Sequence, residues 1–283
     1  MSEAITDLST IAAEPGVPKP DPILVIDGVR KSYGGLLAVD VDHLEIQRGA
    51  ITGVIGPNGA GKTTLFNVLT GFDQADSGSW TYDGEELSRS RSHRIAQKGM
   101  VRTFQLTKAL SRLSVIDNMK LGATDQVGER IWSAPIKAVW SDQEAQIEDR
   151  ADRLLGRFSL GRMREDFAAT LSGGQRKLLE MSRSLMVRPR LVLLDEPMAG
   201  VNTALKQRLL DHILELPSEG MTVVFIEHDM DVVMSISDWV VCLAQGRVIA
   251  EGPPESISQN SEVIDAYLGA HHDEPAITAE DRT

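Results

Sequence analysis

The sequence predicts an α/β fold built around a mainly parallel β-sheet. Short runs rich in apolar and β-branched residues recur along the chain, and stretches with helical periodicity separate them. This alternation is typical of parallel strands that are connected by helices. The runs that we expect to form strands include Ile23–Ile26, Ile51–Ile55, Leu191–Leu194, Thr222–Ile226 and Trp239–Leu243.

The pattern predicts one folded domain over residues 21–270, with a polar tail at each end. Residues 1–20 mix acidic residues with three prolines and show no periodicity, so we expect a flexible N-terminal tail. Residues 271–283 are polar and acidic, and we expect a second tail there. Basic and polar residues become more frequent from about 88 to 170, where Gln143–Phe158 has the pattern of a charged helix. We therefore expect a mainly helical subdomain, inserted into the sheet domain.

The composition argues against several classes of protein. The longest apolar runs are strand-length, far below the roughly 18 residues that a membrane-spanning helix needs, so action at a membrane would require a partner. No basic region followed by an apolar core opens the chain, so no secretory signal is expected. The net charge of −12 opposes nucleic-acid binding, which needs a basic face. The single cysteine, Cys242, excludes an internal disulfide and suits a reducing cytoplasm.

One segment, Gly56–Thr63, matches the phosphate-loop pattern G-x-x-x-x-G-K-[ST]. It follows a predicted strand and precedes a helical run, which is the context that this loop requires. Its glycines let backbone N–H groups turn toward phosphates, and the helix N-terminus adds positive potential. We expect Lys62 to reach the β- and γ-phosphates and the Thr63 hydroxyl to bind Mg²⁺. The expected nucleotide-binding residues are Gly56, Pro57, Asn58, Gly59, Ala60, Gly61, Lys62, Thr63 and Thr64.

Two carboxylates, Asp195 and Glu196, follow the apolar strand Leu191–Leu194. Ligands of an open parallel sheet lie beyond the carboxyl ends of its strands. We therefore expect Asp195 to hold Mg²⁺ and Glu196 to accept a proton from the attacking water. His228 follows another predicted strand in the same way. Its position allows a hydrogen bond to the γ-phosphate or the attacking water, although a histidine at a strand end is more often a surface residue.

A short segment, Leu171–Gln175 with the sequence LSGGQ, links these motifs to a known family. Together with the phosphate loop and the acidic pair, in this order, it closely resembles the signature of ABC ATPases. The resemblance covers Leu24 to about Leu268. It implies a P-loop NTPase core with an antiparallel β subdomain and an inserted α-helical subdomain. It also implies that ATP is held between two chains, its γ-phosphate bound by a second anion cradle at a helix N-terminus. The cradle residues are Ser172, Gly173, Gly174 and Gln175.

The resemblance implies roles for further residues. Tyr33 matches the aromatic residue that stacks on adenine, and Gln105 matches the glutamine that contacts Mg²⁺ and senses the membrane partner. His228 matches the switch histidine, so the resemblance places it with Glu196, Lys62 and Gln105 among the catalytic residues. The loop Ala199–Asn202 matches one that crosses the dimer interface. Many relatives end that loop with Asp, whereas Asn202 retains hydrogen bonding and loses the charge.

The implied function is that of the ATP-binding and hydrolysing subunit of an ABC transporter, peripheral at the cytoplasmic face of the cell membrane. The implied partners are a second ATPase subunit, identical or homologous, two transmembrane permease subunits and an extracytoplasmic substrate-binding protein. The segments Val101–Gln105 and Tyr267–Gly269 look most like the importer branch for branched-chain or other hydrophobic amino acids.

Two alternatives stay open on the sequence alone. The ATPase subunit of a lipid or lipopolysaccharide exporter is closely similar to that of the importer. A soluble ABC ATPase acting on ribosomes or DNA is less favoured, because such proteins usually carry two ATPase domains or long coiled coils. This chain has one set of motifs and no heptad run.

Overall fold

The computed structural model describes residues 8–103, 110–123 and 137–270, which form two compact units. The first unit combines the two ends of the chain, Met1–Arg89 and Ile226–Thr283. The second is the continuous stretch Ser90–Phe225, inserted into the first. This unit begins near residue 88, the predicted start of the helical subdomain, and extends well beyond residue 170, its predicted end. Among the described residues, no helix is both long and apolar enough to cross a membrane.

The first unit contains an antiparallel sheet with the strand order β2-β1-β4-β5. The strands are β1 (Pro22–Tyr33), β2 (Leu36–Gln47), β4 (Ser77–Tyr82) and β5 (Glu85–Glu86). All the pairings between them are antiparallel, which confirms the expected antiparallel β subdomain. The predicted strand Ile23–Ile26 is only the most buried part of β1, because the rest of β1 is mostly polar and largely exposed.

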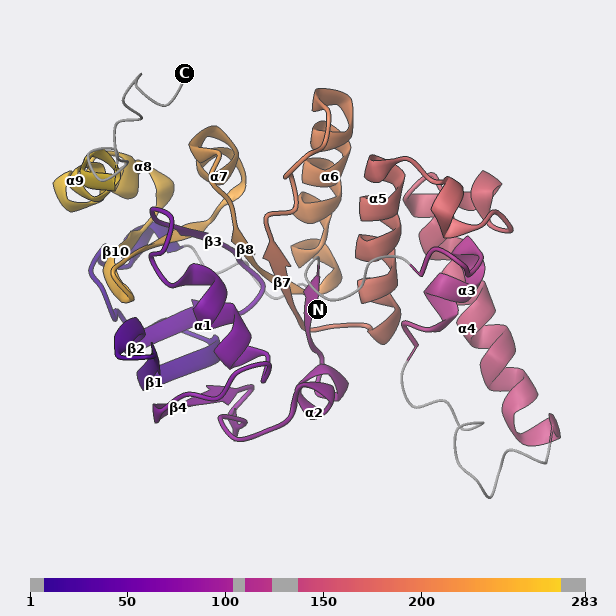
Figure 1. Ribbon diagram of the computed structural model, residues 1–283, viewed down its shortest axis with the longest axis horizontal. Coiled ribbons are helices and arrows are strands. Elements are labelled where there is room, and N and C mark those ends of the chain that lie inside the picture. Colours follow the sequence, from indigo (N-terminus) through magenta and orange to yellow (C-terminus); the bar gives the residue numbers. More distant parts are fainter. Residues whose placement is uncertain (1–7, 104–109, 124–136, 271–283) are drawn as a thin grey trace, which may run out of the picture. The chain divides into compact units, whose positions relative to one another are not determined.

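The same unit contains the strand that leads into the phosphate loop. This strand, β3 (Ile51–Ile55), pairs in parallel with β9 (Trp239–Ala244), which pairs in antiparallel with β10 (Arg247–Gly252). Every residue of β3 is buried, as its continuous apolar run predicts. Helices α8 (Pro254–Ser258) and α9 (Ser261–Ala270) pack beside β10 (Figure 1). The remaining helices are α1 (Lys62–Leu69) and α7 (Met230–Ile236).

The segment before β1 is packed, so the prediction of a flexible tail over residues 1–20 is wrong for its described part. In the short 3₁₀-helix η1 (Leu8–Thr10), Leu8 is buried. The Lys19 ammonium lies 2.9 Å from the Glu251 carboxylate, with side chains 1% and 0% exposed. The Trp239 indole N–H also donates to this carboxylate, at 2.8 Å. Composition could not reveal this anchor, because Lys19 and Glu251 are 232 residues apart in the sequence.

The described residues of the second unit include three strands, in the order β8-β7-β6. They are β6 (Met100–Thr103), β7 (Leu191–Asp195) and β8 (Thr222–Ile226), and β6 pairs in parallel with β7. Between β6 and β7 the described residues form helices and no strand. Helices α3 (Val115–Lys120), α4 (Lys137–Arg157) and α5 (Gly173–Ser184) pack against one another (Figure 1). The predicted charged helix corresponds to α4.

Six further elements lie in the described part of the second unit. They are α2 (Ser92–Gln97), η3 (Gly161–Met163), η4 (Ala168–Thr170), η5 (Leu185–Val187), α6 (Thr203–Glu215) and η6 (Pro217–Glu219).

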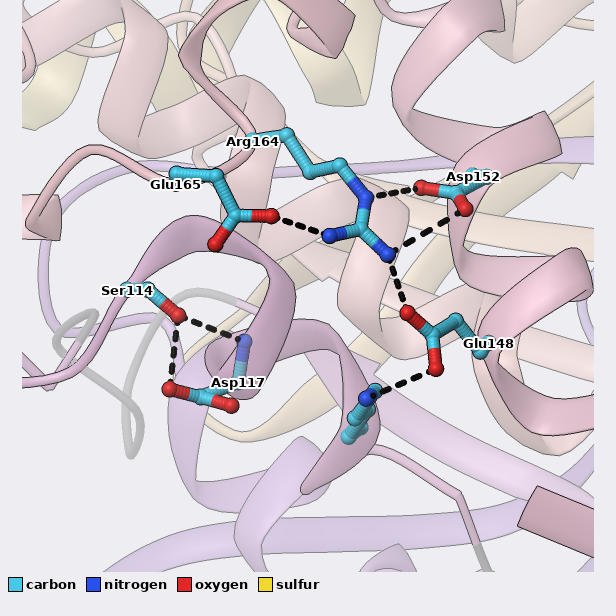
Figure 2. A network of polar contacts seen from close by, with 7 residues as sticks. Ser114, Asp117, Glu148, Asp152, Arg164 and Glu165 are labelled. Carbon is cyan, nitrogen blue, oxygen red and sulfur yellow. Dashed lines mark hydrogen bonds and ion pairs between the residues drawn. The ribbon is translucent and has the colours of Figure 1, made fainter. Parts of the chain in front are cut away.

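Arg164 links the helices that precede the signature segment. Figure 2 shows its guanidinium facing the carboxylates of Glu148, Asp152 and Glu165, with the Asp152 contact at 2.7 Å. Lys120 of α3 donates to the second oxygen of Glu148, at 3.1 Å. Each exposed ion pair contributes only about 0–1 kcal/mol, but the network joins α3, α4 and the segment after η3.

Candidate nucleotide-binding site

The phosphate loop connects β3 to α1 on the first unit. Gly56 directly follows β3 and has φ +144°, a conformation open to glycine and rarely to other residues. A Cβ atom at this position would lie 2.1 Å from the backbone oxygen of Leu243 at the end of β9. The first residue of the loop is therefore glycine because the backbone of β9 passes too close for a side chain.

Lys62 places a buried cation inside this loop. It is the first residue of α1 and is 6% exposed. Its ammonium donates to the backbone oxygens of Gly56 at 2.6 Å and of Pro57 at 2.9 Å. The N-terminal N–H groups of α1, which lack acceptors within the helix, lie at the same end. A buried cation beside a helix N-terminus fits a polyphosphate, and the half-buried hydroxyl of Thr63 adds an oxygen of the kind that Mg²⁺ prefers.

Two further predicted residues of the first unit have accessible side chains. Tyr33 ends β1 and is 45% exposed, as stacking on a base requires. Its hydroxyl donates to the Asp73 carboxylate, and this contact raises the pKa of Tyr33 to about 12. His228 is also exposed, and its backbone N–H donates to the Glu227 carboxylate at 3.3 Å.

On the second unit, the signature segment forms the N-terminus of α5. The Ser172 hydroxyl accepts the Gln175 N–H at 3.2 Å, and the Gln175 side-chain oxygen accepts the Ser172 N–H at 2.8 Å. This reciprocal cap leaves Gly173 and Gly174 at the first two helical positions, whose N–H groups have no acceptor within the helix. A Cβ on Gly174 would lie 2.1 Å from a methyl carbon of Leu205 in α6, so a larger residue there would require the Leu205 side chain to move.

A cavity of about 470 Å³ lies at this helix end. The Asn202 side-chain oxygen caps α6 by accepting the Leu205 N–H at 3.0 Å, and Arg208 adds a cation to the lining. The structure thus brings the predicted signature and the predicted interface loop to one cavity. Its lining consists of Ser172, Gly173, Gly174, Gln175, Leu178, Gly200, Val201, Asn202, Ala204, Leu205 and Arg208.

The acidic pair follows β7 as predicted, and it has partners that the sequence did not reveal. Asp195 is buried, and its carboxylate lies 2.5 Å from the Arg102 guanidinium of β6. Glu196 is half-buried with φ +48°, an uncommon conformation for a residue other than glycine. Lys177 of α5 donates to the Ala199 carbonyl oxygen, and to that of Pro197 at 3.3 Å. Helix α5 therefore holds the loop that carries Glu196.

The predicted site residues lie on both units. The phosphate loop, Tyr33 and His228 belong to the first, and Ser172–Gln175, Asp195 and Glu196 belong to the second. Gln105 lies outside the described residues. Besides Arg102 and Lys177, sequence reasoning missed Tyr267, whose hydroxyl accepts the Gly56 N–H at 2.8 Å. Tyr267 stood out in the sequence only as part of a segment that resembles one importer branch.

Cys242 is buried, as the apolar sequence around it predicts. Burial raises the pKa of its thiol to about 12. The thiol is therefore neutral near pH 7, consistent with a structural role.

Comparisons with known proteins agree with these motifs. Residues 39–199 match the model of the ABC transporter family, and residues 247–273 match that of the branched-chain amino acid ATP-binding cassette transporter. Among curated proteins, the high-affinity branched-chain amino acid transport ATP-binding protein BraF of Pseudomonas aeruginosa is 40% identical over 250 residues, 88% of this chain and 98% of that protein. The high-affinity branched-chain amino acid transport ATP-binding protein LivG of Escherichia coli (strain K12) is 39% identical over 251 residues, which are 88% of this chain and 98% of that protein.

Solved structures show the same likeness. A nucleotide-free ATP-binding cassette from an ABC transporter has a TM-score of 0.75 and 32% identity, and the match covers 87% of this chain and 98% of that one. The ADP conformation of an ATP-binding cassette of an ABC transporter has a TM-score of 0.76 and 32% identity, and the match covers 88% of this chain and 99% of that one. With matches over nearly the full length of its relatives, this chain belongs to the ABC transporter family, among the ATP-binding proteins of the branched-chain amino acid branch.

Proposed function

We propose that this chain binds and hydrolyses ATP to drive the import of branched-chain or other hydrophobic amino acids. The phosphate loop with its buried Lys62 supports the nucleotide chemistry. The proposed substrate rests on the near full-length similarity to proteins named for branched-chain amino acid transport. The lipid or lipopolysaccharide exporter is not favoured, because the relatives described above are named for amino acid transport.

In the proposed reaction, the residues of the chain mainly position and stabilise charge. Lys62 and the N-terminus of α1 bind the phosphates, and the exposed ring of Tyr33 stacks on the adenine. The oxygens of Thr63, Asp195 and Gln105 suit Mg²⁺, which neutralises phosphate charge when it is bound. Glu196 orients the attacking water and accepts its proton, while His228 gives a hydrogen bond to the γ-phosphate.

The second cradle supports a dimer as the working form. The helix N-terminus at Gly173 and the cavity beside it offer backbone N–H groups and the Arg208 cation to an anion. In our proposal this anion is the γ-phosphate of ATP on a second ATPase subunit, identical or homologous. Two membrane permeases and an extracytoplasmic substrate-binding protein complete the transporter, and this chain is peripheral at its cytoplasmic face. Nucleic acid has no part in the proposal.

Uptake of labelled isoleucine by native cells tests the whole proposal. The only copy of the protein would carry Glu196→Gln, in cells whose other isoleucine importers are deleted. The matched control is Glu255→Gln, the same change at an exposed position in α8. We expect Glu196→Gln to abolish uptake and Glu255→Gln to retain it, with equal protein levels and membrane association. Unchanged uptake with Glu196→Gln would contradict the proposed transport function.

Phosphate release by the purified subunit tests the enzymatic step separately. Loss of a general base typically slows a reaction by about 10²- to 10⁴-fold. We expect Glu196→Gln to bind ATP as tightly as the unmodified protein while its turnover falls by such a factor. Full-rate hydrolysis by this variant would rule out Glu196 as the base.

A further inference from the structure

The last described helix reaches the first residue of the phosphate loop. Tyr267 lies in α9, and its hydroxyl oxygen accepts the backbone N–H of Gly56 at 2.8 Å. The two residues are 211 positions apart in the sequence. The Gly56 N–H follows β3 and so lies beyond the sheet pairing, where a buried donor needs another acceptor. Tyr267 supplies that acceptor.

Helix α9 is held where Tyr267 can do this. It packs against α8 and β10, and its Val263 is 4% exposed. Strand β10 pairs with β9. The end of β9 lies beside the loop, as shown by the Leu243 backbone oxygen, which a Cβ on Gly56 would contact. Gly56 is therefore fixed by the β9 backbone and by the Tyr267 hydroxyl.

The contact extends to the catalytic lysine through a single residue. The N–H of Gly56 donates to Tyr267, and the carbonyl oxygen of Gly56 accepts the Lys62 ammonium at 2.6 Å. A shift of Gly56 therefore displaces an acceptor that holds Lys62. Burial raises the pKa of the Tyr267 phenol to about 12, so it stays neutral near pH 7 and places no negative charge beside the loop.

We propose that Tyr267 is a positioning residue for nucleotide binding, through which the C-terminal helix α9 sets the conformation of the phosphate loop. The inference rests on the proposed nucleotide-binding function and adds a regulatory consequence to it. Any event that lifts α9 from β10 removes the acceptor of the Gly56 N–H and weakens ATP binding. The end of the chain is thereby coupled to the affinity of the phosphate loop.

The first test compares Tyr267→Phe with the unmodified chain. Phenylalanine keeps the ring and removes only the hydroxyl. The matched control, Tyr82→Phe, removes the hydroxyl of a buried tyrosine in β4 of the same unit. We expect Tyr267→Phe to raise the Kd for ATP about threefold to tenfold, as the loss of one neutral hydrogen bond implies. KM should rise in parallel while kcat changes little, and Tyr82→Phe should leave both unchanged.

The second test follows the Gly56 amide itself. Tyr267→Phe should shift the amide resonance of Gly56 and speed its hydrogen exchange in the nucleotide-free protein. The Ile51 amide, which donates to the Asp238 carboxylate at 2.8 Å at the start of β3, is the internal reference. Faster exchange at Gly56 alone supports the proposal. Equal acceleration at both amides would show a general loss of stability and overturn it.

The outcomes distinguish the role proposed for Tyr267 from the proposed nucleotide-binding function. If the unmodified chain binds no ATP, the proposed function fails. If it binds ATP with a Kd that Tyr267→Phe leaves unchanged, only the role of Tyr267 is overturned.

Discussion

The Arg102 guanidinium lies 2.5 Å from the Asp195 carboxylate, and the two side chains are 3% and 4% exposed. The residues belong to the neighbouring parallel strands β6 and β7. Asp195 is also the residue expected to hold Mg²⁺. In a buried ion pair, each charge offsets the cost of removing the other from water. The loss of one partner therefore leaves a buried charge without compensation. Arg102 therefore stabilises the second unit and orients the carboxylate.

Arg102→Met should destabilise the nucleotide-free protein strongly. Breaking a buried ion pair costs about 3–5 kcal/mol, and the free energy of unfolding should fall by about that amount in urea denaturation. The double variant Arg102→Met, Asp195→Asn removes both charges and should recover part of the loss. Arg112→Met, which removes an exposed guanidinium from the same unit, should cost less than about 0.5 kcal/mol. Equal midpoints for Arg102→Met and Arg112→Met would contradict this account.

Five of the ten strands in the described residues, and the positions of the motifs, could be predicted from the sequence, because they depend on local pattern. The bounds of β3 and β8 agree with the predicted runs Ile51–Ile55 and Thr222–Ile226. Both strands are fully buried, so apolar residues mark their whole length. Strand β1 extends well beyond Ile23–Ile26. Its second half is mostly polar and exposed, with Val29 as its one buried residue, so the apolar run ends before the strand does.

The contacts that organise the site could not be predicted, since they join distant parts of the chain. Arg102 meets Asp195 across 93 positions and Tyr267 meets Gly56 across 211. The first pairing depends on the register of β6 against β7, and the second on where α9 packs. A single sequence specifies neither. The packing of residues 8–20 was missed for the same reason, because the partner of Lys19 lies in β10.

Lys62→Ala should weaken nucleotide binding itself. The substitution removes the buried cation and its two hydrogen bonds to loop carbonyls, so both the charge and the shape of the cradle change. Hydrogen bonds to charged groups contribute about 1.5–3 kcal/mol, so the Kd for ATP should rise about tenfold or more. Isothermal titration of the purified protein measures this value, with Lys98→Ala as the control at an exposed lysine. Unchanged affinity would count against the phosphate loop as the binding site.

Asn202 caps the N-terminus of α6, and this role predicts which substitutions it tolerates. Its side-chain oxygen accepts the Leu205 N–H at the start of α6. Asn and Asp cap helices about equally well, whereas replacement by Ala costs about 1 kcal/mol. Asn202→Asp should therefore keep the free energy of unfolding within a few tenths of a kcal/mol, and Asn202→Ala should lower it by about 1 kcal/mol. Equal loss in both variants would show that capping does not explain this residue.

His212 should make the protein less stable in mild acid. Its ring lies 4.3 Å from that of Phe158, centroid to centroid, and burial together with the nearby Arg157 lowers the pKa of His212 below about 6.5. In the pH range between the lowered pKa and about 6.5 the unfolded chain binds more protons than the folded one, so stability falls as pH falls through this window. Glu215, at 3.8 Å, opposes the shift without reversing it.

His212→Gln should remove this dependence. The comparison is the drop in Tm from about pH 7.5 to about pH 5.5, measured for the unmodified chain and for the variant. All other histidines are the same in both proteins, so the difference between the two drops reports on His212 alone. We expect the drop to be smaller for His212→Gln, because glutamine takes up no proton on unfolding. A drop of equal size would show that His212 titrates alike in the folded and unfolded chains, and that its burial beside Phe158 carries no cost in acid.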